Sequence, residues 1–254
     1  MGKNILIAGE SWVKHITHMK GFDMFTSIEY ETGVKWLKEA AESGGFEVTH
    51  MPGHEVPDNF PFTKEELNKY AAVVLSDIGA NSLLLSGDCF LRGRVTADRC
   101  KVIADYVSEG GAFAMIGGYM SFSGIDAKAR YGVTAIGDIL PVAILNVDDR
   151  VEVPQGVTPR TVNESHPIMS GLGEWPHFLG YNKTVIKTES SVELLSTAGG
   201  DPFVAVREYG KGRTGIFASD AAPHWGPVEF LEWRGYKKFW AQFFKWLVKE
   251  QNGK

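Results

Sequence analysis

Continuous apolar runs alternate with amphipathic stretches through the first half of the chain. Residues 5–8, 71–76 and 112–116 are such runs, and they are typical of strands buried on both faces of a parallel sheet. Apolar residues at three- and four-residue spacing, followed by two glycines, predict an amphipathic helix over residues 27–43. Strand and helix patterns therefore follow each other in turn.

The same alternation continues between these runs. Residues 46–51 have the pattern of another strand, and Thr63 with Glu66 forms a capping-box pattern before a short helix. Thr96 is the expected N-cap of a further helix, which ends at the glycine pair 110–111. Such alternation predicts an α/β fold with a central, mostly parallel sheet flanked by helices, in which ligands gather at the carboxyl ends of the strands.

The second half of the chain has a different pattern. Residues 142–203 contain short β-branched runs separated by Pro, Gly and Asn, which predict added antiparallel strands. The runs 203–207 and 214–218 flank a glycine-containing turn and predict a hairpin. Aromatic residues at helical spacing over residues 236–247 predict a C-terminal core helix. No repeat or linker divides the chain, so we expect a single domain over residues 1–254.

Composition narrows the class of protein. Apolar residues make up 44% of the 254 residues and charged residues 22%, and no apolar window reaches the ~20 residues of a membrane-spanning helix. A net charge of −5 argues against a nucleic-acid surface. Residues 1–9 lack the features of a secretory signal, and the two cysteines suit a reducing compartment. We therefore predict a cytoplasmic protein that binds neither nucleic acid nor membrane; the 12% of aromatic residues suit either a homo-oligomer interface or a large core.

Four segments follow predicted strands or turns in a recognisable order: residues 76–81, 115–121, 165–172, and 209–213 leading to 221–226. In this order they resemble the class I glutamine amidotransferase-like superfamily, and especially its branch related to the trehalose-utilisation family. The resemblance covers nearly the whole chain. It implies a flavodoxin-like fold.

The resemblance also allows a comparison of the family's catalytic positions. A working amidotransferase of this superfamily has a Gly-x-Cys-x-Gly turn and a His-x-Glu pair. In the best register Tyr119 stands where the nucleophilic Cys is expected, with Gly117 before it and Ser121 in place of the last glycine. His224 is followed by Trp225 and then by glycine, so of the pair only the histidine is present. Because the unperturbed pKa of Tyr is about 10, it cannot easily replace a thiolate as acyl acceptor, and the site argues against glutamine hydrolysis.

Several residues after predicted strands are candidates for chemistry. His224 can exchange protons near neutral pH, and Tyr119 can donate a hydrogen bond or stabilise an oxyanion. Asp77, Gly79 and Asn81 follow a buried strand, in the loop that the superfamily uses for its oxyanion hole. The alternatives are helix capping for His224 and Asp77 and core packing for Tyr119.

The segment after the first strand is a second group of candidates. Glu10, Trp12, His15 and His18 follow the first strand, and the carboxylate with the two histidines could share one side of a helical turn, either as a divalent-metal site or as a polar wall for a substrate. The spacing alone is weak evidence for a metal, so we predict neither metal nor cofactor and place Glu10, Trp12 and Ser121 among the substrate-binding residues. Side chains of Trp12, Trp225 and Phe122 could form a stacking face for a small ligand such as a sugar.

Three functions remain open at this point. The first is a hydrolase or lyase that uses His224 as acid or base on a small polar, carbohydrate-like metabolite. The second is a non-catalytic ligand-binding or assembly protein. The third is a thiol hydrolase or amidotransferase in which Cys89, the cysteine expected in a loop, pairs with His224, whereas Cys100 falls within a helical pattern.

Overall fold

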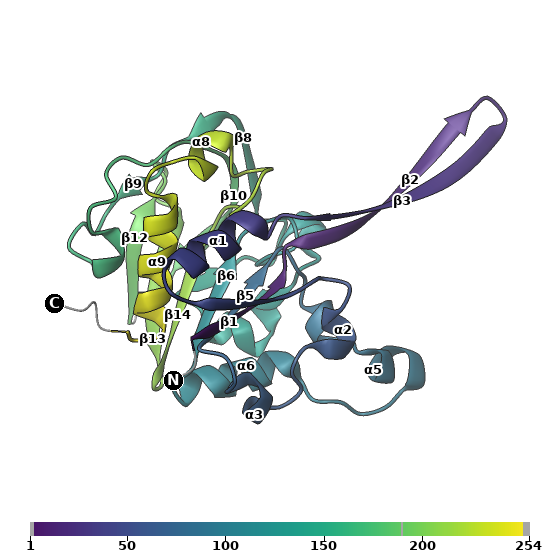
Figure 1. The fold of residues 1–254 in the computed structure, drawn as a ribbon, viewed down its shortest axis with the longest axis horizontal. Helices are drawn as coiled ribbons and strands as arrows, with labels where there is room; N and C mark the ends of the chain where they lie inside the picture. The colour runs from purple at the N-terminus through teal and green to yellow at the C-terminus, as the bar shows by residue number, and fades with distance from the viewer. Residues whose placement is uncertain (1–2, 189, 251–254) are drawn as a thin grey trace.

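The computed structural model describes residues 3–188 and 190–250, and its core is an eight-stranded sheet in the order β4-β1-β5-β6-β14-β13-β12-β9 (Figure 1). The first five strands run parallel and the remaining pairs are antiparallel. The strands are β1 (Asn4–Gly9), β4 (Glu47–Met51), β5 (Ala72–Ser76), β6 (Ala112–Ile116), β9 (Arg160–Thr161), β12 (Ser191–Ser196), β13 (Pro202–Tyr209) and β14 (Gly212–Phe217). The α/β flavodoxin-like fold class is confirmed, with the parallel strands in the flavodoxin order.

Helices cover both faces of this sheet. On β14, Thr214 donates a hydrogen bond to the Ile139 carbonyl, whereas the neighbouring Gly215 lies against the Phe243 ring. Because successive residues of a strand face opposite sides, these two contacts place α7 and α9 on opposite faces. Helix α1 packs beside α9, and α6 packs with α3 and α7 (Figure 1). The helices are α1 (Lys35–Ser43), α3 (Lys64–Leu67), α6 (Arg99–Ser108), α7 (Ala135–Ile139) and α9 (Tyr236–Leu247).

The C-terminal helix and the capping box agree with the sequence. Six residues of α9 are buried, in the aromatic stripe read from the sequence: Tyr236, Phe239, Trp240, Phe243, Phe244 and Leu247. The Thr63 side chain accepts from the Glu66 amide and the Glu66 side chain accepts from the Thr63 amide. The N-cap of α6 is Asp98 and not Thr96, because the Asp98 carboxylate accepts from the Lys101 amide.

Smaller elements surround the main sheet. Two short antiparallel ribbons pair β8 (Arg150–Val157) with β10 (Phe178–Asn182) and β7 (Val142–Ile144) with β11 (Thr184–Ile186). The remaining helices are α2 (Val56–Asn59), α4 (Asn81–Leu84), α5 (Gly87–Arg92) and α8 (Val228–Leu231), with 3-10 turns at Ile125–Ala127, Tyr131–Val133 and Pro167–Met169. Among the residues that the structure describes, none of the helices is both long and apolar enough to cross a bilayer.

The segment between β1 and α1 is the main departure from the predicted elements. Residues 11–32 form a long hairpin of β2 (Ser11–Lys20) and β3 (Asp23–Thr32), which projects from the body (Figure 1). The predicted helix over 27–43 is therefore wrong for its first turns, and the helix begins at residue 35. Strand 23–32 is rich in β-branched and aromatic residues, and Gly21 adopts the positive φ (+64°) that the tight turn requires.

The hairpin also removes the predicted helical turn that carried Glu10, Trp12, His15 and His18. In a strand, residues three apart face opposite sides, so His15 and His18 do not share a face of β2. No group of three His, Cys, Asp or Glu side chains arranged to hold a metal occurs among residues 3–188 and 190–250.

Candidate functional site

The carboxyl ends of four parallel strands bring candidate side chains to one edge of the sheet. Glu10 follows β1, Asp77 follows β5, Tyr119 follows β6, and Asp220 with His224 follows β14. Strands β4 and β5 lie on either side of β1, so the chain order reverses between β1 and β5. Ligand sites of open α/β sheets form at such a reversal point, which here lies between Glu10 and Asp77.

Asp220 and His224 form a hydrogen-bonded pair. The Nδ1 atom of His224 lies 2.7 Å from Oδ2 of Asp220, which also accepts the backbone N–H of Trp225 at 3.0 Å. Burial raises the pKa of Asp220, and the hydrogen bond to Asp220 raises the pKa of His224. The His224 side chain is 45% exposed, and in the described part of the chain its Nε2 atom has no hydrogen-bond partner. The pair thus has the arrangement of an oriented acid–base histidine.

Tyr119 packs against this histidine. The two rings meet edge to face with centroids 4.5 Å apart, and the Tyr119 hydroxyl donates to Oε1 of Glu152 at 2.8 Å. The other oxygen of Glu152 accepts the indole N–H of Trp225 at 3.0 Å, and the Arg150 guanidinium lies 4.8 Å from the Tyr119 ring centre. The hydrogen bond to Glu152 raises the pKa of Tyr119, which keeps the phenol protonated and able to donate.

Two further acidic side chains, Asp77 and Glu10, lie close to the pair. A Cβ atom on Gly118 would lie 2.8 Å from Oδ1 of Asp77 and 3.0 Å from Oδ1 of Asp220, so both carboxyl groups pack against this glycine. Burial, followed by the charge of Asp220, raises the pKa of Glu10 to about 8. Burial, followed by the same charge, raises the pKa of Asp77 to about 6. At neutral pH Glu10 is therefore a protonated carboxylic acid, and the Ser76 hydroxyl is hydrogen-bonded to it.

The backbone is strained at the same three strand ends. Glu10 has φ +50°, Asp77 has φ +46° and His224 has φ +137°, values that non-glycine residues rarely adopt. Such conformations cost of order 1–3 kcal/mol each and cluster at functional sites. Their position on the candidate residues is independent support for this edge of the sheet as the site.

Buried polar side chains fix the loop after β6, which carries Tyr119. Asn182 accepts the Gly118 amide at 2.9 Å and donates to the Gly118 carbonyl at 3.1 Å. It also donates to Asp149, whose carboxylate accepts two further amides of the same loop. Ser121 ties this loop to the one after β5, because its hydroxyl accepts the Asp77 amide at 3.1 Å.

Sequence comparison identifies the family. The pattern of the family described as "Putative glutamine amidotransferase" (GATase1_like) matches residues 4–249. The chain belongs to this amidotransferase-like family. No curated protein matches the sequence.

Solved structures of similar proteins have the same fold. "Cytoplasmic Protein STM1381 from Salmonella typhimurium LT2" is 45% identical with a TM-score of 0.92, and the match covers 96% of this chain and 99% of that one. "Cytoplasmic Protein STM3548 from Salmonella typhimurium" is 41% identical with a TM-score of 0.92, covering 96% and 98%. A "Putative thua-like protein from Parabacteroides merdae" shares the fold at 11% identity and a TM-score of 0.58, covering 98% of this chain and 90% of its own.

In this amidotransferase-like chain some predicted site residues lie elsewhere. Gly79 and Asn81 line a neighbouring hollow of about 590 Å³ together with Met120. Trp12 lies at the root of the hairpin and donates to Glu31 at 3.1 Å. Ser121 is buried and holds two loops together, as described above. Their role as substrate contacts stays a prediction. In the structure these residues shape the loops around the site.

The predicted stacking face is wrong for two of its three members. Trp225 is 1% exposed and Phe122 is fully buried, so neither ring is open to a ligand. Trp225 instead supports Tyr119, because both side chains donate to the same carboxylate, Glu152. The Tyr119 ring is the half-exposed aromatic surface beside His224.

Cys89 lies in α5 and not in a loop. It lines a hollow of about 510 Å³ with residues 93–98, and α5 comes from a different part of the chain than the loops at the strand ends. The described contacts of the His224 ring are with Asp220, Tyr119 and Trp225, and Cys89 is not among them. Cys100 is buried in α6, and burial raises its pKa to about 12.

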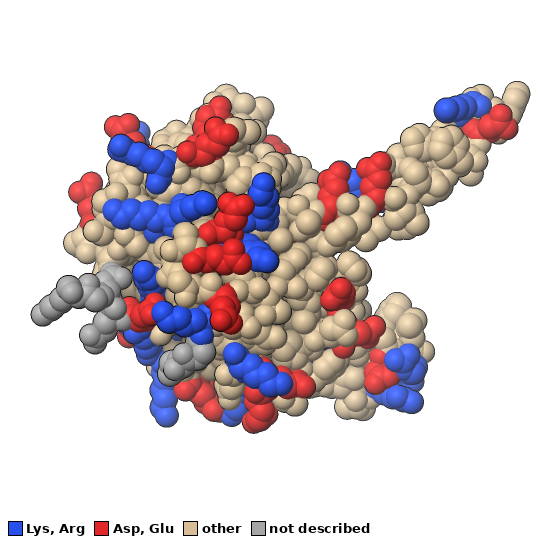
Figure 2. Space-filling model, viewed as in Figure 1, with Lys and Arg blue, Asp and Glu red and all other residues tan. Residues whose placement is uncertain are grey.

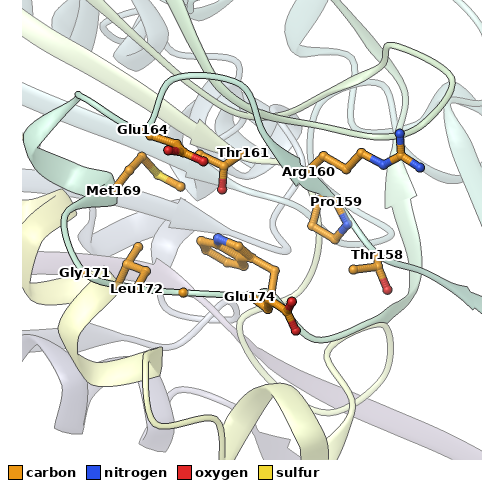
Figure 3. A pocket seen from close by; sticks show the side chains of 11 residues that line it. Thr158, Pro159, Arg160, Thr161, Glu164, Met169, Gly171, Leu172 and Glu174 are labelled. Atoms are coloured by element: carbon orange, nitrogen blue, oxygen red, sulfur yellow. The ribbon is translucent and has the colours of Figure 1, made fainter.

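A larger hollow, of about 680 Å³, lies beneath the segment 158–175 (Figure 3). Its lining combines apolar side chains such as Met169 and Leu172 with the charged Arg160, Glu164 and Glu174. It shares no lining residue with the strand-end cluster around His224. Glu10, Asp77, Asp220 and His224, whose pKa values are all raised, lie together at the strand ends, and three of them have a positive φ, so we place the candidate site there and not in the larger hollow.

Asp220, Glu152 and Arg150 are the site residues that sequence reasoning missed. Asp220 comes two residues after the apolar run 214–218, so the rule that polar residues after strands form the site could have found it. Glu152 and Arg150 lie in an antiparallel strand, and only the folded chain brings that strand beside Tyr119.

Proposed function

We propose that this protein is an acid–base enzyme that acts on a small, hydroxyl-rich metabolite with His224 as the proton-transfer group. The hydrogen bond of 2.7 Å between Asp220 and His224 carries the proposal, because it fixes the imidazole with Nε2 open beside Tyr119. A carboxylate bonded to Nδ1 orients the ring and favours the protonated imidazole that forms when Nε2 accepts a proton.

Each neighbouring group has a role in this proposal. Nε2 of His224 removes a proton from a substrate hydroxyl or carbon and returns it to the leaving group. The neutral phenol of Tyr119 donates to Glu152 in the free protein, and it exchanges this acceptor for a substrate oxygen that gains negative charge. Glu10, protonated at neutral pH, is a second neutral acid at the reversal point of the sheet.

The charges around the site support the substrate class. Glu152, Asp77 and Asp220 supply acceptor oxygens near Tyr119 and His224, which suits a donor-rich neutral molecule such as a sugar derivative. The nearby cation, Arg150, is paired with Asp148 at 2.7 Å, so an anionic substrate would find mainly like charge here. The two relatives named cytoplasmic proteins support a cytoplasmic location for this reaction.

The test is a screen of sugars, polyols, amides and carboxylic acids by thermal shift, followed by product analysis for each compound that binds. We expect turnover of a hydroxyl-rich compound by the wild-type protein and equal turnover by Cys89→Ser, because Cys89 has no contact with His224. Binding without any product would favour the non-catalytic alternative. Loss of turnover in a folded Cys89→Ser protein would favour the thiol alternative and contradict the proposal.

A further inference from the structure

The hairpin of residues 11–32, here called the arm, stands clear of the rest of the protein (Figure 1). Each strand has ten residues, so the arm extends roughly 30 Å at ~3.4 Å per residue. It is tied to the body at its root, where the Gly53 amide donates to the Ser11 hydroxyl and the Gly33 amide donates to the Glu10 carbonyl. A two-stranded ribbon without further packing is marginally stable in water, so the outer arm lacks a stabilising surface of its own.

The strand register divides the side chains of the arm into two faces. Cross-strand pairs share a face, and they run from Ser11 opposite Thr32 to Lys20 opposite Asp23. One set, here called the uncharged face, has no acidic or basic residue other than one histidine: Val13, His15, Thr17, Met19, Met24, Thr26, Ile28 and Tyr30. The opposite set, the charged face, carries every Lys, Asp and Glu of the strands: Lys14, Lys20, Asp23, Glu29 and Glu31.

The two faces also differ in how their side chains are partnered. On the charged face Lys14 pairs with Glu31 at 2.5 Å, and His18 stacks on Phe25 with centroids 4.5 Å apart. On the uncharged face all eight side chains are exposed, with Ile28 at 65%, Met24 at 68% and Met19 at 76%. A long exposed apolar ribbon is an aggregation hazard unless another surface covers it.

A second exposed apolar surface lies on the same side of the molecule. It consists of Leu85, Phe90, Leu91 and Val95, which are 37%, 71%, 75% and 101% exposed, and we call it the α5 patch. A hollow of about 510 Å³ lies beside it. Figure 2 shows the arm and the lobe that carries α5 on either side of an open recess.

We propose that the uncharged face of the arm docks on the α5 patch of a second copy of this chain, reciprocally, so that two copies exchange arms. One chain carries both apolar surfaces, and neither needs a different protein to cover it. The charged face of the arm, with its three acidic residues and two lysines, then points away from the α5 patch and stays in contact with water.

The buried area favours exchange over simple stacking of two arms. One face of the ribbon measures roughly 300 Å², so two stacked arms bury about 600 Å², below the ~1,200 Å² at which specific interfaces begin. Two reciprocal arm-to-body contacts bury about 1,200 Å² and reach that size. The area therefore selects the arrangement in which each arm lies on the body of its partner.

The test is the mass in solution of the full-length protein and of matched variants, by sedimentation at several concentrations. We expect the wild-type protein to have at least twice the 28.0 kDa of one chain. Met24→Lys, on the uncharged face, should reduce the number of subunits, whereas Phe25→Lys, the next residue on the charged face, should not. Phe90→Lys on the α5 patch should act like Met24→Lys, and Val228→Lys, an exposed valine on α8, is its control.

Each alternative result has a definite meaning. A monomeric wild-type protein, or a Met24→Lys protein of unchanged mass, overturns the proposal. Dissociation by Met24→Lys but not by Phe90→Lys overturns the α5 patch as the acceptor. Because the contact is apolar, 1 M salt should not dissociate the wild-type protein, and dissociation by salt would point instead to its charged face.

Discussion

The His224→Asn protein is expected to lose 10²- to 10⁴-fold in kcat/KM on the metabolite that the wild-type protein converts, which is about the range that a positioned acid–base group contributes. Asparagine keeps a donor for Asp220 and, like histidine, is among the residues most often found at positive φ, so the substitution adds little backbone strain. It cannot exchange a proton. The loss should therefore fall mainly on kcat, with thermal stability close to that of the wild-type protein.

The pH dependence of kcat/KM in the wild-type enzyme tests the same role of His224. When His224 acts as a base, its neutral form is active, so kcat/KM should fall as the pH drops through the pKa of His224. The hydrogen bond to Asp220 raises that pKa, so the fall should begin at a higher pH than for an ordinary histidine. A His224→Asn protein with unchanged kcat would remove His224 from the mechanism.

The second large effect concerns Glu10 and stability. The pKa of Glu10 is raised from 4.5 to about 8 in the folded protein, mainly by burial. Between these two pH values the folded state holds a proton that the unfolded state has released, so the free energy of unfolding falls as the pH rises through this window. The Glu10→Gln substitution replaces the carboxyl group with an amide, which does not titrate in this pH range. Its stability relative to the wild-type protein should grow by a few kcal/mol from pH 5 to pH 8 and then level off.

Urea unfolding at a series of pH values measures this difference. Glu47→Gln, an exposed position on the neighbouring strand β4, is the control for the exchange of acid for amide. It should show a much smaller change with pH. A Glu10→Gln protein whose relative stability is the same at pH 5 and pH 8 would mean that Glu10 is not a buried neutral acid.

The sequence predicted the layered fold because its signals were local. The buried strands after residues 4, 71 and 111 are continuous apolar runs, and α9 has a clear aromatic stripe. The arm was missed because the apolar spacing between Tyr30 and Val34 crosses the boundary between a strand and a helix. All eight side chains of its uncharged face are exposed, so strand alternation there could not be assigned to a core.

The candidate site was predictable only in part. The rule that polar residues follow parallel strands located Glu10, Asp77, Tyr119 and His224. It could not predict the partners of these residues, because Tyr119, for example, contacts Glu152, which lies 33 residues away in the sequence. It also placed Trp225 on the ligand side, although the indole is buried and points its N–H at Glu152.

The most direct test of the central claim is the titration of the His224 imidazole by NMR in the wild-type protein and in Asp220→Asn, with the signal assigned by its loss in His224→Asn. We expect a pKa above the ordinary 6.5 in the wild-type protein and a clear decrease in Asp220→Asn, because the amide cannot stabilise the protonated ring. Equal pKa values in the two proteins, or a wild-type pKa below 6.5, would contradict the account of an Asp220-oriented acid–base histidine.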